Sequence, residues 1–258
     1  MAFANQVAVI TGASSGIGWE LAKELARQKC AVGVIARRQD RLEALVAEIE
    51  GAGGTAAWAS ADVGSRADAV TAVHSLRDRL GPIDLLIANS GVGLPTTIEP
   101  MNVEEIEQMF QVNTMGVVYA IDAVLPDMLK RGSGHIAAVS SLAAYQALPA
   151  ESGYCASKAA VNSFMDGLRM QLRPRNITVT TICPGFILTP MTASNTFKMP
   201  FLLSAERSAQ LIVQALARKK KVYDFPWQTT LLMKALRWLP DWLVIRATRH
   251  KPPDRQTT

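Results

Sequence analysis

The sequence predicts one doubly wound α/β domain, in which a seven-stranded, mostly parallel sheet carries helices on both faces. First, short apolar runs alternate with longer segments of helical periodicity along the first 226 residues. Second, a glycine-rich turn lies between the first such run and the first helix, where a doubly wound sheet binds its ligand. Strands joined through helices form right-handed units and lie parallel, so both observations indicate one open sheet.

The strands are predicted where Val, Ile, Leu and Ala form continuous runs of strand length. The first of these, 6–11, is short, apolar and β-branched, as expected of a strand buried on both faces. The other strands are predicted at 31–36, 55–60, 83–88, 135–140, 177–182 and 219–226.

Each of the first five strands is followed by a segment with helical periodicity. In the second of these segments, Leu42, Leu45 and Ile49 recur at the spacing of one helix face. The fourth segment is expected to break or bend around Asn113 to Gly116. The helices are predicted at 19–29, 39–50, 65–80, 102–130 and 153–172.

The composition is that of an ordinary soluble domain, with 49% hydrophobic and 19% charged residues in a chain of 258. The three cysteines are not spaced as in a disulfide framework, and the three histidines are not spaced as metal ligands. We therefore predict no metal site and a protein that resides in a reducing compartment. Met1 leads into the first strand without a basic leader, which predicts no signal peptide and a cytoplasmic location. The uncharged run 176–197 contains Pro184 and Pro190, so it is interpreted as strand and loop rather than a membrane span.

Positive charge is concentrated at the end of the chain. Residues 218–258 hold ten Lys or Arg and three Asp, a net charge of +7 against +5 for the whole chain. The basic pI therefore describes the tail and not the domain, and no nucleic-acid partner is predicted. We divide the chain into a nucleotide-binding and catalytic domain, 1–226, and a basic, Trp- and Leu-rich extension, 227–258. Pro240 divides this extension into two short helices.

Tyr154 and Lys158 are the first candidates for chemistry. Their spacing of four places both side chains on one face of the predicted helix. An ammonium group beside a phenol favours the phenolate, and a phenol with a lowered pKa suits proton transfer near neutral pH. A half-buried Tyr and a solvated Lys on an ordinary helix would show the same spacing. The rest of the sequence must therefore decide whether the pair is catalytic.

The turn 11–18 is the candidate phosphate site. Its glycines at 12, 16 and 18 permit a tight turn and close backbone approach, and the following helix N-terminus favours an anion. A plain strand-to-helix turn is the alternative for this segment taken alone.

Three motifs together resemble the classical short-chain dehydrogenases/reductases. They are Thr-Gly-x3-Gly-Ile-Gly at 11–18, Asn-x-Gly at 89–91 and Tyr-x3-Lys at 154–158, in family order and spacing over residues 5–190. The resemblance implies a Rossmann-type fold and hydride transfer between a nicotinamide cofactor and a carbonyl or alcohol carbon.

The resemblance also implies catalytic roles. Tyr154 would give or take the proton of the substrate oxygen, and Lys158 would lower the Tyr154 pKa and bind the nicotinamide ribose. Ser141, thirteen residues before Tyr154, would orient the substrate oxygen. Ser140 competes for this role, although adjacent strand residues point to opposite faces and family spacing favours Ser141. Asn113 would hold a water in the proton relay, and a helix irregularity is the alternative for it.

The same resemblance implies the cofactor contacts. Asp62 would contact the adenine, and the segment 184–189 would pack on the nicotinamide and hold its carboxamide. Ser90 is a small departure from the Ala of the family's Asn-Ala-Gly. The full set is Gly12, Ser14, Ser15, Gly16, Ile17, Gly18, Arg37, Arg38, Asp62, Val63, Asn89, Ser90, Gly91, Tyr154, Lys158, Pro184, Gly185, Ile187 and Thr189.

The end of the second strand predicts NADP(H) rather than NAD(H). An NAD-preferring site places a carboxylate there to hold the ribose hydroxyl. This chain has Ala36, followed by Arg37 and Arg38, whose guanidinium groups can pair with a 2′-phosphate. The alternative is two solvated charges at a helix start. Ser15 occupies the position where some NADP-dependent relatives add a Lys.

Two segments concern the substrate and partners. The Met- and Phe-rich stretch 190–203 is interpreted as a lid for an apolar carbonyl or alcohol, with a helix edge over the core as the alternative. The tail, through 222–224 and 227–232, looks like the 11-beta-hydroxysteroid dehydrogenase branch, whose C-terminal helices form a dimer and lie near membrane. It predicts a homodimer or homotetramer. The alternatives for its Trp, Leu, Lys and Arg side chains are a cover for the core without lipid and a peripheral membrane contact.

Two other classes of function are compatible with parts of the sequence. A nucleotide-sensing protein could keep the fold and lose the chemistry, but the intact Ser141, Tyr154 and Lys158 argue against it. A membrane or scaffold protein acting through the tail would make the nucleotide site incidental.

Overall fold

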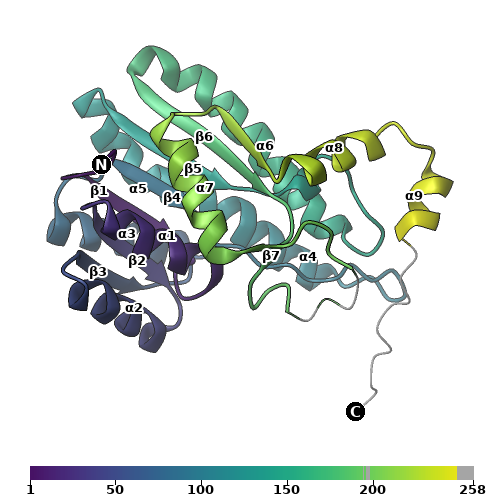
Figure 1. The fold of residues 1–258 in the computed structure, drawn as a ribbon, viewed down its shortest axis with the longest axis horizontal. Coiled ribbons are helices and arrows are strands. Elements are labelled where there is room, and N and C mark those ends of the chain that lie inside the picture. Colours follow the sequence, from purple (N-terminus) through teal and green to yellow (C-terminus); the bar gives the residue numbers. More distant parts are fainter. Residues whose placement is uncertain (194, 196–197, 249–258) are drawn as a thin grey trace.

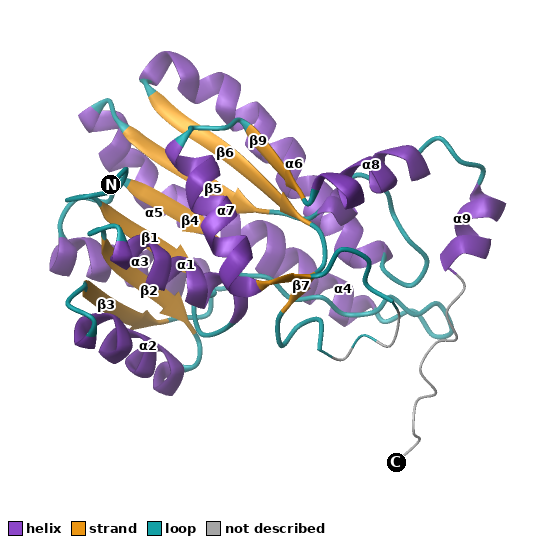
Figure 2. Ribbon diagram, in the orientation of Figure 1, coloured by secondary structure: helices purple, strands orange, loops and turns teal. Residues whose placement is uncertain are grey.

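The computed structural model describes residues 1–193, 195 and 198–248. It contains one seven-stranded sheet in the order β3-β2-β1-β4-β5-β6-β9, and all six pairs of neighbouring strands are parallel (Figures 1 and 2). The predicted doubly wound fold is confirmed, with a sheet that is parallel throughout. The strands are β1 (Val7–Thr11), β2 (Ala31–Ala36), β3 (Thr55–Ser60), β4 (Leu85–Ala88), β5 (Gly134–Val139), β6 (Ile177–Pro184) and β9 (Val222–Phe225).

Helices cover both faces of the sheet. On one face α1, α2 and α7 enclose a core that includes Leu21, Leu45 and Ile212, and on the other α3, α5 and α6 enclose a second core. The helices are α1 (Gly16–Arg27), α2 (Gln39–Gly51), α3 (Arg66–Leu80), α4 (Val103–Phe110), α5 (Gly116–Arg131), α6 (Ser152–Leu172), α7 (Ala205–Ala217), α8 (Trp227–Leu236) and α9 (Asp241–Thr248).

The predicted helix 102–130 is interrupted near Asn113, as expected, and the interruption is a π turn, Gln111–Met115, between α4 and α5. The combined segment 103–131 has the length and hydropathy of a membrane span. However, Val117, Ile121 and Val124 on α5 are buried in the second core. Packing against the sheet therefore accounts for its apolar character.

Helix α7 is the main element that the sequence analysis leaves unassigned. Its buried Ala209, Ile212, Val213 and Leu216 recur at helical spacing and pack against α1. It follows the lid segment, in which β7 (Ile187–Leu188) and β8 (Leu203–Ser204) form a short parallel pair. Residues 194, 196 and 197 of the predicted lid lie outside the described residues.

The C-terminal extension forms the two expected short helices on either side of Pro240. Helix α8 packs on β9 and on the 3-10 turn Leu142–Ala144, where Met233 is buried with Leu142. The predicted boundary at residue 226, between the domain and the extension, thus separates α8 from elements on which it packs. Helix α9 stands beyond α8 at the edge of the molecule (Figure 1). The predicted tail residues 249–258 lie outside the described residues.

Candidate active site

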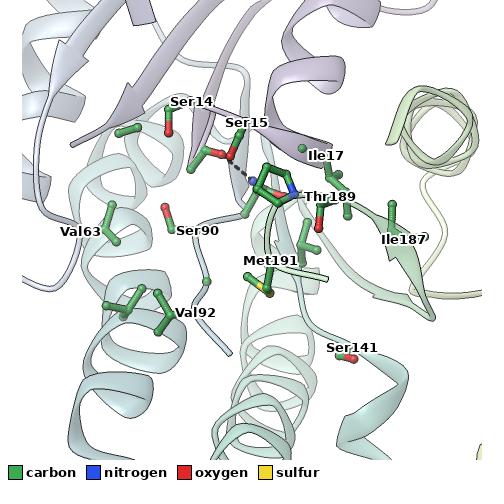
Figure 3. A pocket seen from close by; sticks show the side chains of 18 of the residues that line it. Ser14, Ser15, Ile17, Val63, Ser90, Val92, Ser141, Ile187, Thr189 and Met191 are labelled. Carbon is green, nitrogen blue, oxygen red and sulfur yellow. Dashed lines mark hydrogen bonds between the residues drawn. The ribbon is translucent and has the colours of Figure 1, made fainter. Parts of the chain in front are cut away.

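A cavity of about 320 Å³ lies at the carboxyl ends of the strands. In Figure 3, Ser14 and Ser15 lie at one end of it, Ser141 lies at the other, and Val63 and Ile187 line opposite walls. All the predicted site residues line this cavity except Gly18 and Asn113, which pack directly behind its wall. The cavity therefore joins the segments that the sequence analysis selected from along the chain.

The glycine-rich turn is held tightly against the segment that follows β4. A Cβ atom at Gly12, where φ is +69°, would lie 2.7 Å from Ser90 Cα, and one at Gly18 would lie 2.5 Å from the Gly12 carbonyl oxygen. The Asn89 side chain donates to the carbonyl oxygens of Thr11 (3.0 Å) and Gly12 (3.3 Å). Asn89 thus holds the turn in place by binding its carbonyl oxygens. The N-terminus of α1 remains open to an anion.

The two adjacent serines have different surroundings. Ser140 is buried, and its hydroxyl donates to the Lys158 carbonyl oxygen at 3.0 Å. The Ser141 Oγ faces the cavity, where it accepts from the Ala143 N–H at 3.1 Å and also forms a hydrogen bond with Tyr154. This arrangement favours Ser141 over Ser140 as the residue that meets the substrate.

Tyr154 and Lys158 both line the cavity, but their pKa values differ from the sequence expectation. Burial raises the pKa of Tyr154 to about 12, and a hydrogen bond with Ser141 offsets only part of this rise. Burial lowers the pKa of Lys158 to about 8. The expected lowering of the Tyr154 pKa by Lys158 is therefore wrong for this structure. Lys158 Nζ lies 5.9 Å from the centroid of the Tyr154 ring and donates to the Val139 carbonyl oxygen at 3.0 Å.

Asn113 is fully buried, and the π turn directs its amide toward the loop after β4. Its Oδ1 accepts from the Val92 N–H at 2.8 Å, and its Nδ2 donates to the Val92 carbonyl oxygen and to Ser157 Oγ, both at 2.9 Å. A Cβ atom at Gly91 would lie 3.2 Å from Lys158 Nζ, so glycine there lets Lys158 approach this loop. Asn113 is thus a positioning residue in the structure, and its role in a water relay stays a prediction.

Arg38 lies over the glycine-rich turn at the other end of the cavity. Its Nη2 donates to Ser14 Oγ and Ser15 Oγ, both at 2.9 Å. The Arg37 side chain is exposed at the cavity rim and forms no hydrogen bond with the part of the chain that the structure describes. Asp62 accepts from the Gly64 N–H at 2.9 Å, which holds the loop after β3 against the cavity.

The family profile described as short chain dehydrogenase matches residues 6–199. The chain belongs to this family. The match covers the glycine-rich turn, helix α6 with Tyr154 and Lys158, and β6. It makes the protein an NAD(P)-dependent oxidoreductase.

The relatives of this short-chain dehydrogenase are similar over most of its length. An uncharacterized oxidoreductase of Myxococcus xanthus is 37% identical over 246 residues, covering 95% of this chain and 97% of the relative. The ketoacyl reductase HetN of a Nostoc species is 31% identical, covering 83% and 76%. The crystal structure of levodione reductase superposes with a TM-score of 0.80 at 22% identity, covering 89% of this chain and 99% of the other, which shows the shared fold.

The residues of this short-chain dehydrogenase fit a dinucleotide cofactor. A Cβ atom at Gly12 or Gly18 would strike backbone, as expected of a turn shaped for close approach, and Thr189 packs against the same turn, where a Cβ atom at Gly16 would lie 3.0 Å from Thr189 Cγ2. Within residues 1–193, 195 and 198–248, no cluster of His, Cys, Asp or Glu could hold a metal ion. Sequence reasoning missed the lining residues Ala61, Val92, Val112, Val139 and Thr192, and it missed Ser157 behind the wall. Apart from its position next to Lys158, Ser157 gave no signal, because its role depends on a contact with Asn113.

Proposed function

We propose that this protein is an NADP(H)-dependent reductase or dehydrogenase for an apolar carbonyl or secondary alcohol. The observation that carries the proposal is one cavity with Ser141, Tyr154 and Lys158 at one end and two arginines at the other. Between the arginines and the catalytic residues lies the glycine-rich turn at the start of α1, which suits a pyrophosphate.

The nicotinamide supplies or takes up the hydride when bound. Tyr154 transfers the proton of the substrate oxygen, since it lines the cavity beside Ser141 and its raised pKa keeps it protonated at neutral pH. The Ser141 hydroxyl, which forms a hydrogen bond with Tyr154 and lines the same cavity, orients the same oxygen. Lys158, buried at the cavity wall, provides the positive charge for the ribose hydroxyls and for the developing phenolate.

The experiment that tests the proposal follows NADPH absorbance with purified protein and a panel of carbonyl compounds. The panel contains levodione and a ketoacyl thioester, named after the relatives, together with phenanthrenequinone and a steroid ketone. We expect turnover with the apolar members, because Met191, Phe201 and Leu202 of the lid expose apolar surface. Tight NADPH binding without turnover on any member would support the nucleotide-sensing alternative instead.

Replacing Arg37 by Ala is expected to weaken NADPH binding about tenfold or more and to leave NADH binding unchanged. A charge-assisted hydrogen bond to a phosphate contributes about 1.5–3 kcal/mol, and NADH lacks that phosphate. The measurement is a fluorescence titration of both nucleotides. Arg41→Ala is the matched control, because Arg41 is a nearby arginine in the first turn of α2 that stacks on Trp19, 4.8 Å from the ring centroid. Equal affinities for NADPH and NADH in the unchanged protein would remove the basis for the preference.

We also propose that the protein is a cytoplasmic homodimer or homotetramer whose tail is covered by a second copy. Trp227, Trp238 and Trp242 are 67%, 87% and 63% exposed, and Leu231 on α8 and Ile245 on α9 add to the apolar surface that the extension exposes. A monomer in water would leave this surface uncovered. The resemblance of the tail to the 11-beta-hydroxysteroid dehydrogenase branch stays a prediction.

Deleting residues 238–258 is expected to convert the oligomer to a smaller species and to keep the nucleotide fold. The deletion removes Trp238 and Trp242 but retains α8, which packs on the domain. Sedimentation and the melting temperature check the two expectations. Pelleting of the full-length protein with anionic liposomes, reversed by salt, would assign the tail to lipid instead. Unchanged mass and no pelleting would show that neither partner covers it.

A further inference from the structure

One carboxylate connects three segments that are far apart in the sequence. Asp224 on β9 accepts a hydrogen bond from the Tyr145 hydroxyl at its Oδ1 and from Lys234 Nζ at its Oδ2, both at 2.7 Å. Lys234, on α8, also lies over the Tyr145 ring, 4.8 Å from its centroid. Tyr145, Asp224 and Lys234 therefore form a closed set of contacts between the loop after β5, the edge strand β9 and helix α8.

This set of contacts is sheltered from water on its inner side. The Asp224 side chain is 13% exposed, and Tyr145 packs on a small cluster formed by Leu142, Cys183 and Met233. Burial, with the neighbouring Cys183 and Asp224, raises the pKa of Tyr145 far above its usual range, so the hydroxyl stays a donor. A charge-assisted hydrogen bond in such surroundings is directional and about twice as strong as a neutral one.

Tyr145 is joined to Ser141 through a hydrogen-bonded turn. The Tyr145 N–H donates to the Leu142 carbonyl oxygen, and the Ala144 N–H donates to that of Ser141, both at 3.1 Å. The Ala143 N–H donates to Ser141 Oγ itself, also at 3.1 Å. A displacement of Tyr145 would therefore move the turn that holds the catalytic candidate.

We propose that Tyr145 is a positioning residue for Ser141, and that Asp224 and Lys234 fix Tyr145 so that helix α8 sets the place of the serine hydroxyl. The inference rests on the proposed function in one respect, because it takes Ser141 as the residue that orients the substrate oxygen. It assigns α8 to the active-site framework, whereas sequence reasoning placed this helix in a separate extension.

The proposal predicts a loss of turnover without a loss of cofactor binding. A misplacement of about 1 Å can cost roughly 100-fold in rate. The remaining bond from the Ala143 N–H to Ser141 limits the displacement, so we expect Tyr145→Phe to lower kcat about tenfold with NADPH and phenanthrenequinone. The dissociation constant for NADPH should stay within about twofold, because Tyr145 does not line the cavity.

Lys234→Met keeps most of the side-chain length but removes the charge, and we expect it to lower kcat about threefold. The matched control is Lys220→Met. Lys220 also lies over a tyrosine ring, 4.6 Å from the centroid of Tyr223, but its backbone hydrogen bonds are with Ala215 and Thr180 and not with the turn that holds Ser141. Equal effects of the Lys220 and Lys234 substitutions on kcat would overturn the proposal.

Hydrogen exchange gives a readout that needs no substrate. In Tyr145→Phe and Lys234→Met, the amides of residues 143–145 should exchange faster, and those of β1 should keep their protection. If the protein reduces no carbonyl compound, the proposed function fails, but this measurement still decides whether the contacts hold the turn. Unchanged exchange at 143–145 in both variants, or a uniform increase across the domain, would overturn the inference. If Tyr145→Phe fails to fold, Lys234→Met, which alters only a partly exposed side chain, carries the test.

Discussion

Replacing Tyr154 by Phe is expected to remove nearly all turnover while NADPH still binds. General acid–base catalysis by a placed side chain contributes about 10²- to 10⁴-fold, and Phe cannot transfer a proton. The substitution keeps the ring, which packs against Gly93, where a Cβ atom would lie 3.7 Å from Tyr154 Cδ2. The cavity wall should therefore keep its shape. Steady-state rates and a fluorescence titration of NADPH measure the two effects separately. Retained turnover would mean that Ser140 or a water molecule supplies the proton.

The pH dependence of the unchanged enzyme offers an independent check of the same residue. The pKa of Tyr154 is about 12, so the phenol is protonated at neutral pH. The rate of carbonyl reduction, which needs the protonated phenol and the charged Lys158, should be nearly constant from about pH 6 to 7. The rate of alcohol oxidation, which needs the phenolate, should rise with pH over the same range. A reduction rate that falls steeply over this range would show that cofactor binding shifts the Tyr154 pKa down toward neutrality.

The parts of the site that could be predicted depend on local spacing. Each of these motifs is local in the sequence: the glycine turn and Ser141 follow strand ends, and Tyr154 and Lys158 share one helix. The fold brings all of them to one cavity. The bend near Asn113 was expected, but its partners Val92 and Ser157 were not, because these contacts join separate segments. The Val139 carbonyl oxygen that accepts from Lys158 belongs to the backbone and carries no residue-type signal.

The pKa values show most clearly what spacing cannot supply. Sequence reasoning treated Lys158 as a charge acting on a nearby phenol, which requires both groups to keep their usual solvation. In the structure Lys158 is buried and Tyr154 is partly buried, and desolvation is the largest cause of both shifts. The contact between Asp224, Tyr145 and Lys234 was missed for a related reason, since it depends on how α8 packs on β9.

Lys158→Met is expected to lower turnover at least 100-fold and to make the protein more stable at neutral pH. Lys158 is 3% exposed, and its one hydrogen bond, to the Val139 carbonyl oxygen, does not replace its hydration. The pKa is lowered from 10.5 to about 8 by burial. A shift of this size means that the charged form of Lys158 destabilises the folded state by roughly 3 kcal/mol. Loss of the donor to Val139 offsets about 1 kcal/mol, which leaves a net gain of about 2 kcal/mol for Met.

The sign of this effect can be checked through its pH dependence. Below about pH 8, Lys158 is charged in the folded and unfolded states, so its full destabilising effect is present. Between about pH 8 and 10.5 the unfolded chain binds more protons, so the unchanged protein gains stability and the advantage of Met shrinks. The Tyr154 shift acts in the opposite direction above pH 10, but it is common to both proteins and cancels in the difference. Denaturant unfolding at neutral and alkaline pH measures this difference. A Met variant that is less stable than the unchanged protein at pH 7 would show that Lys158 supports the fold, whereas the expected gain would show that its charge is kept for catalysis at a cost in stability.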